Sequence, residues 1–298
     1  MSDYLVKGYA YDGTVRVYAA ITTQLVEHAR TIHQLWPTAT QALGRTLTAG
    51  VIQGSFYSED QQITIRIDGG GPLGKILVDA DAHGHVRGYV QNAHVNLIYD
   101  KGDKAGHSAV GQAVGNNGFI QVTKDLKIRD FFTSSAALQT GEIAEDFTYY
   151  FATSEQIPSA VGLGVIVNTD NSVRVAGGFI LQVMPGCKKE HIERIEAIIQ
   201  EMPPLNDLLQ QGKMPEDIVD VLTDMKWDPL FTLPLAYQCN CSKERFRSGL
   251  ATLPDHELIE MTEDEVTKTE CQFCRSEYLF TPEELEAIMV ERKETKGS

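Results

Sequence analysis

The chain has 298 residues, which is more than a single domain usually holds, so about two domains are expected. With 42% hydrophobic and 22% charged residues, its composition excludes wholesale disorder. A formal net charge of -15 argues against proteins whose main task is to hold nucleic acid or an anionic membrane, because both tasks need a positive field.

The first residues do not resemble a secretory signal, and no run of about 18 apolar residues occurs, so we expect a cytoplasmic protein. Cysteines in the cytoplasm are reduced by default. Five of them in this chain favour metal binding or redox chemistry over a framework of disulfides. Cys187 stands apart from the other four, and we expect it to pack as a small hydrophobic residue.

Residues 1–184 are predicted to form one α+β domain, in which helices accompany a mixed sheet. Strand patterns, either β-branched runs or alternating apolar and polar residues, occur at 15–21, 63–68, 75–78, 119–123, 161–167 and 173–183. A helical period of 3.6 residues runs through Leu25, Ala29, Ile32 and Trp36. A second helix is expected at 143–151.

Two short motifs in this domain invite a ligand-binding interpretation. The glycine-rich run at 69–76 is one residue short of a phosphate-binding loop, and Ile76 cannot provide the hydroxyl that holds magnesium. We therefore expect a glycine-rich hairpin there. His83 and His85 flank Gly84 without other metal ligands nearby in the sequence, so we expect a turn.

Residues 185–230 are predicted to form a helical linker region. One apolar face of its first helix carries Ile192, Ile195, Ile198 and Ile199, and the helix stops before Pro203. Further helices are expected at 205–211 and from Pro215. Such short helices are marginal alone in water, so their stability depends on what covers their apolar faces. A helical layer docked permanently on the first domain fits the same pattern.

Residues 231–298 are predicted to form a small C-terminal domain that binds zinc. A capping box at 281–284, with proline at the first helical position, predicts a terminal helix. Between residues 255 and 298 there are 13 Asp and Glu but only five Lys and Arg. The region around the cysteines is acidic and has few large apolar residues, so its fold should depend on the metal.

The last four cysteines form two close pairs, Cys239 with Cys241 and Cys271 with Cys274, separated by 29 residues. Two short chelating pairs supply the tetrahedron of thiolates that Zn²⁺ prefers, so one zinc ion per chain is predicted. The site could be a permanently closed structural centre or a redox switch. Thiolates are the species that oxidants attack, and oxidation to disulfides removes the ligands. Cationic side chains that could offset the charge of the site, or simply be solvated, are Lys243, Arg245, Arg247, Lys268 and Arg275.

With these cysteine pairs, the sequence closely resembles the thirty-three-kilodalton heat-shock protein family of redox-regulated holdase chaperones. Segments that share the resemblance are 12–16, 42–47, 86–88, 154–156 and 177–179. The resemblance implies a reduced, zinc-bound, inactive state and an oxidised state with Cys239–Cys241 and Cys271–Cys274 disulfides. From the sequence alone, three pairings are open. Cys187 is not part of the family's motif.

The resemblance also implies a chaperone, not an enzyme, which binds unfolding client proteins without ATP under oxidative stress. Its active form is commonly dimeric, and the linker region becomes unstable on activation. The dependence of the terminal domain on zinc leads to the same expectation, because loss of zinc should unfold that domain and uncover the apolar face of the linker. Ile192, Ile195, Ile198 and Ile199 are therefore the candidate client-binding surface.

Two alternatives stay open at this stage. The spacing of Cys271 and Cys274 also occurs in thiol-disulfide oxidoreductases, although the strand-then-helix setting of such enzymes is not indicated here. A zinc-ribbon protein that binds nucleic acid is disfavoured by the acidic tail. No nucleophile elbow or zinc-protease motif supports a hydrolase.

Overall fold

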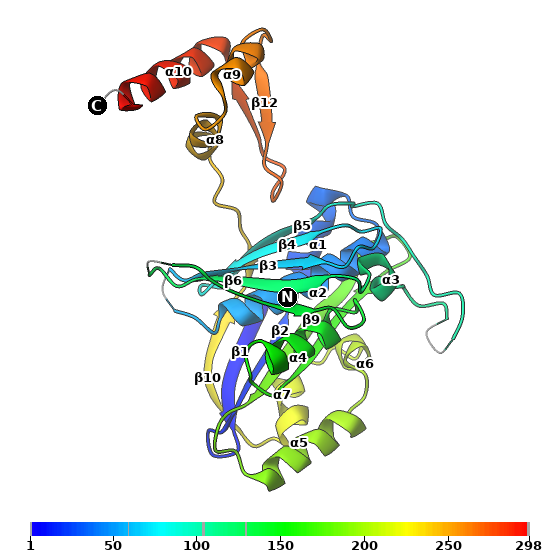
Figure 1. Ribbon diagram of the computed structural model, residues 1–298. Helices are drawn as coiled ribbons and strands as arrows, with labels where there is room; N and C mark the ends of the chain where they lie inside the picture. Colours follow the sequence, from blue (N-terminus) through cyan, green and yellow to red (C-terminus); the bar gives the residue numbers. More distant parts are fainter. Residues whose placement is uncertain (1, 59, 103–104, 129, 297–298) are drawn as a thin grey trace. The chain divides into compact units, whose positions relative to one another are not determined.

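The computed structural model describes residues 2–58, 60–102, 105–128 and 130–296 (Figure 1). Up to residue 238, its strands are β1 Tyr4–Ala10, β2 Val15–Ile21, β3 Gln62–Asp68, β4 Ile76–Asp81, β5 His85–Val90, β6 Phe119–Asp125, β7 Phe132–Ala137, β8 Ser159–Val167, β9 Val173–Val183, β10 Trp227–Pro234 and β11 Ala236–Tyr237. The helices of the same part are α1 Thr23–His33, α2 Pro37–Gly54, α3 Val110–Val114, α4 Ala144–Thr153, α5 Lys189–Glu201, α6 Leu205–Gln210 and α7 Pro215–Thr223.

These strands form two sheets. The first, here called sheet A, has the order β10-β1-β2-β9-β8, and its neighbouring strands are all antiparallel. The second, sheet B, has the order β11-β5-β4-β3-β6-β7, in which only β11 runs parallel to its neighbour. On β3, buried and half-buried residues alternate from Ile63 onward, as the sequence pattern predicted for a strand with one solvated face.

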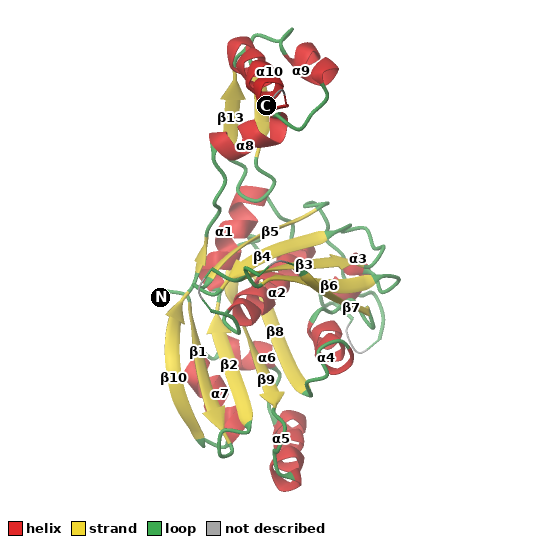
Figure 2. Ribbon diagram, turned by 60° about the vertical axis from the view of Figure 1, so that its left-hand side comes forward, coloured by secondary structure: helices red, strands yellow, loops and turns green. Residues whose placement is uncertain are grey.

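Helix α2 lies between the two sheets (Figure 2) and packs against strands of both. Fifteen of its 18 residues are buried, so it has no polar face. At Gly44 a Cβ atom would lie 2.7 Å from the side chain of Val26, and at Gly50 it would lie 2.9 Å from that of Val78. Glycine at these two positions therefore lets the helix approach its neighbours closely. The main hydrophobic core surrounds this helix.

The other face of sheet A is covered by the linker helices α5, α6 and α7. Here Val17, Phe179 and Leu181 of the sheet form a second core with side chains of the three helices. The linker region therefore adopts the docked arrangement that the sequence pattern permitted, with sheet A as the surface that covers its apolar face.

The structure differs from the sequence-based expectation at the end of the first predicted helix and in several elements that no pattern indicated. The helix predicted through Trp36 ends at His33, and Gln34 has the left-handed backbone (φ 52°) that often ends helices. Trp36 is 50% exposed and extended, because a residue before proline disfavours the helical conformation. Strands β1 and β10 and helix α2 were not predicted.

Both short motifs set aside in the sequence form turns, as expected. Residues 69–75 connect the antiparallel strands β3 and β4, and a strand, not a helix, follows Lys75, so the phosphate-loop interpretation fails. His83 lies in the tight turn between β4 and β5. The Nδ1 atom of His85 lies 3.0 Å from a carboxylate oxygen of Asp81, so the imidazole of His85 has a hydrogen-bond partner within the hairpin.

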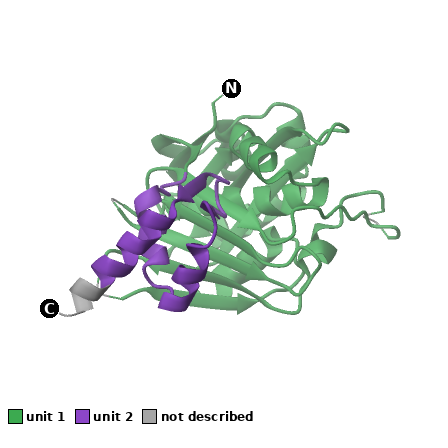
Figure 3. Cartoon of the chain, turned by 90° about the horizontal axis from the view of Figure 1, so that it is seen from above, with its two compact units in different colours: residues 1–238 green, residues 239–298 purple. Residues whose placement is uncertain are grey.

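The described chain divides into two compact units, residues 1–238 and 239–298 (Figure 3). By compactness, residues 185–230 belong to unit 1, and the predicted boundary after residue 230 falls inside β10. The division into segments 1–184, 185–230 and 231–298 stays a prediction about how the chain works.

The described part of unit 2 contains two short strands and three helices: α8 Lys243–Leu250, α9 Asp255–Met261, β12 Thr267–Glu270, β13 Glu277–Phe280 and α10 Pro282–Lys296. Thr281 and Glu284 form the predicted capping box, since the backbone N–H of each donates to the other's side chain. None of the helices in the described part of the chain has the length and apolar character needed to span a bilayer.

Candidate metal centre

The four clustered cysteines come from two loops of unit 2. Cys239 and Cys241 follow β11 and precede α8, whose N-cap residue Ser242 accepts a hydrogen bond from the backbone N–H of Arg245. Cys271 and Cys274 lie in the turn between β12 and β13. The antiparallel pairing of these two strands ends at residues 270 and 277, so the turn holds the second pair at the tip of a hairpin.

Backbone hydrogen bonds shape this tip. The N–H of Cys271 donates to the carbonyl of Ser276 (2.9 Å), and the N–H of Arg275 donates to the carbonyl of Cys271 (2.8 Å). Arg275 itself has a left-handed backbone with φ 60°, which closes the turn. The backbone N–H groups of Phe273 and Cys274 also point at the sulfur of Cys271 and favour its ionised form. A tip of this kind presents both sulfurs to one side.

All four sulfur atoms lie within 4.8 Å of one another. The Sγ atoms of Cys239 and Cys271 are 3.7 Å apart, and those of Cys241 and Cys274 are 3.2 Å apart. A tetrahedral zinc site with Zn–S bonds of about 2.3 Å has sulfur–sulfur edges of about 3.8 Å. Both contacts are longer than the S–S bond of about 2.05 Å, so the cysteines are thiols and not disulfides. The donor set therefore fits a Zn²⁺ ion.

The pKa values of the thiols indicate that a cation is needed to hold the cluster in its ionised form. Burial raises the pKa of Cys241 to about 12 and also raises the pKa of Cys271. Burial opposes ionisation of Cys274 too, but hydrogen bonds with Ser276 and with neighbouring thiols lower its pKa to about 7. Without a metal, these buried sulfurs cannot all be thiolates at neutral pH. A divalent cation among them compensates the charge of the ligands.

Polar side chains hydrogen-bond to two of the sulfurs and to the backbone of the first cysteine loop. The hydroxyl of Tyr278 donates to Cys241 Sγ at 3.2 Å, and the Ser276 hydroxyl lies 3.2 Å from Cys274 Sγ. Arg245 donates to the carbonyl of Asn240, the residue between the first two cysteines, at 2.8 Å. Tyr278 and Ser276 were not singled out from the sequence, because a loop's fold decides which neighbours face its sulfurs.

The other cations near the cysteines in sequence are paired with glutamates. The pairs are Lys243–Glu284, Arg247–Glu291, Lys268–Glu277 and Arg275–Glu270. Carboxylates neutralise the charges of these four side chains. Arg245, the fifth cation of the predicted set, instead places its guanidinium against the cysteine loop.

The candidate client-binding side chains lie on α5 in unit 1. Ile195 and Ile198 are only 3% and 6% exposed, and Ile195 belongs to the second core. Ile192 and Ile199 are half-buried. In this state of the molecule the apolar face of α5 is therefore covered, and clients could reach it only if the helix left sheet A.

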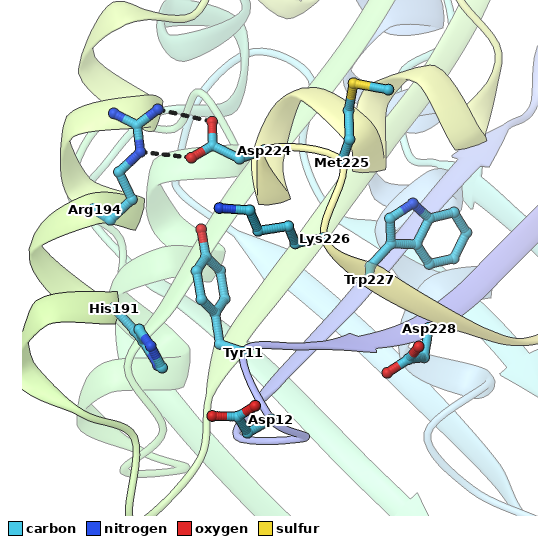
Figure 4. Close-up of a pocket in the computed structure, with 9 residues that line it drawn as sticks. All are labelled: Tyr11, Asp12, His191, Arg194, Asp224, Met225, Lys226, Trp227 and Asp228. Atoms are coloured by element: carbon cyan, nitrogen blue, oxygen red, sulfur yellow. Dashed lines mark hydrogen bonds and ion pairs between the residues drawn. The ribbon is translucent and has the colours of Figure 1, made fainter.

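Polar contacts fix the start of α5 around a pocket of about 610 Å³ (Figure 4). Arg194 makes two hydrogen bonds to the carboxylate of Asp224, at 2.6 and 2.7 Å. The ring of Tyr11, from the turn between β1 and β2, lies 4.9 Å from the ring of His191. Asp224 and Met225 both have left-handed backbones, an uncommon conformation for residues other than glycine. The turn after α7 therefore stores strain while it presents Asp224 to α5.

Cys187 lies outside the cysteine cluster. It is half-buried and packs against the second core, beside the start of α5. Within the described residues, the group of cysteines, histidines and carboxylates that could hold a metal consists of the other four cysteines.

Comparisons with known proteins agree with this geometry. The family model described as Hsp33 protein matches residues 3–281. The 33 kDa chaperonin of Geobacillus sp. (strain WCH70) is 49% identical over 97% of both chains. That of Bacillus subtilis (strain 168) is 46% identical over 96% of this chain and 98% of its own. The crystal structure of the 33 kDa chaperonin of Thermotoga maritima matches with a TM-score of 0.91 and 33% identity, over 99% of this chain and 100% of the other.

Proposed function

The chain belongs to the Hsp33 protein family, and from this premise we propose that it is a redox-regulated chaperone that holds unfolding proteins without ATP. The observation that carries the proposal is the clustering of the sulfurs of Cys239, Cys241, Cys271 and Cys274 within 4.8 Å of one another, in a unit with a small apolar core. The protein starts in a reducing compartment, the cytoplasm, with these thiols reduced.

In the inactive state, the four cysteines hold one Zn²⁺ ion. The metal supplies a link between the two loops and keeps the sulfurs ionised. The described part of unit 2 buries five apolar side chains: Leu250, Leu258, Phe280, Leu285 and Ile288. A core of this size contributes little stability, whereas structural zinc contributes about 10–16 kcal/mol of apparent binding free energy in peptides. Unit 2 therefore stays folded through the metal.

Oxidation removes the ligands. Each disulfide forms when two sulfurs give two electrons to one molecule of peroxide, which leaves as two water molecules after taking up two protons. The pairing is Cys239 with Cys241 and Cys271 with Cys274, as the family resemblance implies. The short sulfur contacts of the reduced state run between the motifs, so each pair must turn towards its own partner as the site opens.

Loss of the metal can reach the linker region through the chain itself. Cys239 comes two residues after Tyr237, whose hydroxyl donates to the carbonyl of Gly88 at 2.9 Å. Strand β11 has only two residues and pairs with the edge of sheet B, while β10 before it is an edge strand of sheet A. When unit 2 unfolds, the segment from 235 to 238 loses its folded continuation and frays more readily, which weakens the hold on β10 and the turn before it.

The client-binding surface is then two-sided. Release of α5 exposes Ile192, Ile195, Ile198 and Ile199, and it also uncovers the face of sheet A that carries Phe179 and Leu181. A contiguous apolar surface of this kind binds unfolded chains. The active form is a homodimer, which would double the surface offered to one client. The net charge of -15 keeps the exposed surface soluble.

Two alternatives are less well supported. The Cys271–Cys274 pair lies at the tip of a hairpin and does not lead into a helix, unlike the redox pair of a thioredoxin-like oxidoreductase. The acidic residues of unit 2 pair with most of its nearby cations, which leaves little positive charge for nucleic acid. The curated relatives are named chaperonins, and no catalytic residue is part of the proposal.

The test is to treat the zinc-loaded protein with peroxide at mildly elevated temperature and to follow zinc, free thiols and aggregation of an unfolded client together. We expect loss of four thiols and one zinc ion per chain, followed by suppression of aggregation. Full zinc release with no gain in client binding would contradict the proposal. Retention of zinc under the same treatment would assign the cluster to a permanent structural site.

A further inference from the structure

A cavity of about 220 Å³ lies inside unit 1, apart from the cysteine cluster and the linker region. It opens where one end of sheet A meets the C-terminal ends of α2 and α4 and strand β6. Its polar lining residues include Arg16 from β2, Gln182 from β9, Gln53 from α2 and Lys124 from β6. Arg16 and Gln182 are register partners on neighbouring strands, so their side chains leave sheet A on the same face.

Gln53 lines this cavity, and its side chain carries an unused hydrogen-bonding group. The side chain is only 3% exposed, and its Nε2 atom has no hydrogen-bond partner in the described part of the chain. Gln182 is also almost fully buried, at 2% exposed, but its Nε2 atom donates to the hydroxyl of Ser159 at 3.4 Å. Buried polar groups normally have partners, so the amide of Gln53 points to a group that completes the site.

Arg16 provides a positive charge without a carboxylate. Within the described residues its Nε atom donates to the sulfur of Met184 at 3.0 Å, and no acidic side chain lies within ion-pairing distance of its guanidinium. Lys7, on the neighbouring strand β1, also lacks an acidic partner there. Burial and the charge of Arg16 together lower the pKa of Lys7, as expected for two cations with no anion between them.

Glu155 does not cancel this charge, although it also lines the cavity. Its carboxylate accepts hydrogen bonds from Lys124 and Tyr150, both at 2.5 Å, and from Ser134 at 2.9 Å. Lys124 and Glu155 therefore neutralise each other, and the guanidinium of Arg16 leaves the lining with one net positive charge. In a protein with a net charge of -15, such a local excess needs an explanation.

We propose that this cavity binds a small carboxylate with an apolar body, whose oxygens accept hydrogen bonds from Arg16 and Gln53. The planar guanidinium of arginine matches the geometry of a carboxylate. Phe56, Phe151 and Ile157 line the same cavity and form the apolar contact. The volume limits the ligand to about ten non-hydrogen atoms, smaller than the drug-sized ligands for which pockets of 300 Å³ or more are usual. This binding site goes beyond the proposed chaperone function and does not depend on it.

The test uses the full-length, zinc-loaded, reduced protein and measures binding by calorimetric titration. Benzoate is the probe, and benzamide, its neutral counterpart of similar shape, is the control ligand. Two variants remove one donor each: Arg16→Gln and Gln53→Met. The matched control is Arg66→Gln, because Arg66 is also a half-buried strand arginine but lies in sheet B, outside the cavity lining. Circular dichroism and zinc content establish that each variant is folded.

We expect one benzoate per chain, with benzamide binding at least tenfold more weakly. Arg16→Gln should weaken benzoate binding at least tenfold and Gln53→Met severalfold, while Arg66→Gln leaves it unchanged. If Arg16→Gln does not fold, the Gln53→Met variant and the benzoate-to-benzamide ratio still decide the matter. No binding of benzoate, or equal binding of benzoate and benzamide, would overturn the proposal.

A peptide C-terminus carries the same carboxylate on a longer chain. An N-acetylated tripeptide ending in phenylalanine therefore serves as a further probe of the source of the ligand. A free small acid predicts that the tripeptide binds more weakly than benzoate, because the cavity is too small for it. Tighter binding of the tripeptide would overturn the assignment to a free acid.

Discussion

Residues 1–238 fold around two extensive hydrophobic cores, whereas the described part of residues 239–298 buries five apolar side chains beside a cluster of four thiols. Apolar burial does not respond to oxidants, but a thiolate cluster does. Under the proposed mechanism, an oxidant would therefore unfold unit 2 and leave the two cores of unit 1 intact. A chaperone that must stay soluble while it exposes apolar surface needs this separation.

The linker helices stand between these extremes. By contact they belong to unit 1, yet α5 buries only Ile195 and Ile198, whereas α2 buries 15 of its 18 residues. Helix α5 is therefore the less firmly held of the two. The proposed mechanism uses this gradient, from the metal-dependent unit through a lightly held helix to a core that stays folded.

The largest expected effect comes from removing one cysteine ligand. In Cys271→Ser, three sulfurs remain, and we expect zinc binding to weaken at least a thousandfold because a buried thiolate ligand is lost. Unit 2 should unfold while unit 1 keeps its structure, as followed by zinc content and by limited proteolysis of the two units. Cys187→Ser is the matched control and should retain zinc. If the variant lost zinc and unit 2 still resisted protease, unit 2 would not depend on the metal for its fold.

The second effect is the pH dependence of zinc affinity. In the metal-free protein the pKa values of Cys241 and Cys271 are raised, so at neutral pH both thiols must lose a proton when zinc binds. At least two protons are therefore released, and the affinity falls by a factor of about a hundred or more for each unit by which the pH falls. Below pH 7, protonation of Cys274, with its pKa of about 7, makes the dependence steeper.

The same shifts affect the metal-free fold in opposite directions. The lowered pKa of Cys274 contributes stability above the thiol's ordinary pKa of 9, and this stability is lost as the pH falls through about 7. The raised pKa values of Cys241 and Cys271 contribute stability below the ordinary pKa of a thiol, and this stability is lost as the pH rises through the folded-state values.

The predicted pH dependence of zinc affinity is measured by competition with a zinc-selective dye between pH 6 and 8. An affinity independent of pH would contradict thiolate ligation.

The third prediction addresses the cover of the linker. Ile195→Ala removes a buried side chain from the second core and should destabilise the docked helix by about 2–4 kcal/mol. The reduced, zinc-bound variant should then suppress client aggregation partly, without an oxidant. Ile259→Ala in α9 is the matched control, because Ile259 is 54% exposed. Unchanged activity of the reduced variant, despite measurably weaker protection of α5, would show that this surface does not bind clients.

A smaller effect is expected from the ion pair at the start of α5. Arg194→Gln breaks the two-point contact with Asp224, which joins α5 to the turn after α7. Because both groups are partly solvated, the oxidised variant should become active at a slightly lower temperature than the natural chain. Lys189→Gln on the same helix removes only an exposed contact with Glu193 and serves as the control. Identical activation temperatures for the two variants would exclude a role for the Arg194 contact.

The smallest effect concerns the hydroxyl beside the cluster. Tyr278→Phe removes the hydrogen bond to Cys241 but keeps a ring that can stack on Phe246, whose centroid lies 5.0 Å away. A thiolate that accepts fewer hydrogen bonds is a better nucleophile, so peroxide should release zinc a few times faster. Stopped-flow measurement with a zinc dye tests this expectation. A slower release would mean that the hydroxyl assists oxidation.

Sequence patterns revealed those parts of the fold that have one covered face and one solvated face. The alternation on β3 and the isoleucine face of α5 could be predicted for this reason. Helix α2 could not, because burial on all sides leaves no amphipathic period. Strand β10 carries two prolines and is mostly exposed, so it lacks the usual strand signal although it pairs with β1.

The cysteine site could be predicted further than its surroundings. Spacing alone indicated that four sulfurs would meet, because each short pair is a chelating unit, and the structure brings them within 4.8 Å. The contacts of Tyr278 and Arg245 depend on how the hairpin and the loop before α8 fold, which no spacing encodes. In the same way, the cavity at Arg16 gathers residues from five separate elements.

The most direct test is hydrogen exchange of the natural chain before and after peroxide treatment at mildly elevated temperature. The account predicts that amides of unit 2 and of residues 189–223 lose protection together, while α2 and sheet B keep theirs. Loss of protection in unit 2 with unchanged protection of the linker helices would contradict the central claim that the zinc site controls the client-binding surface.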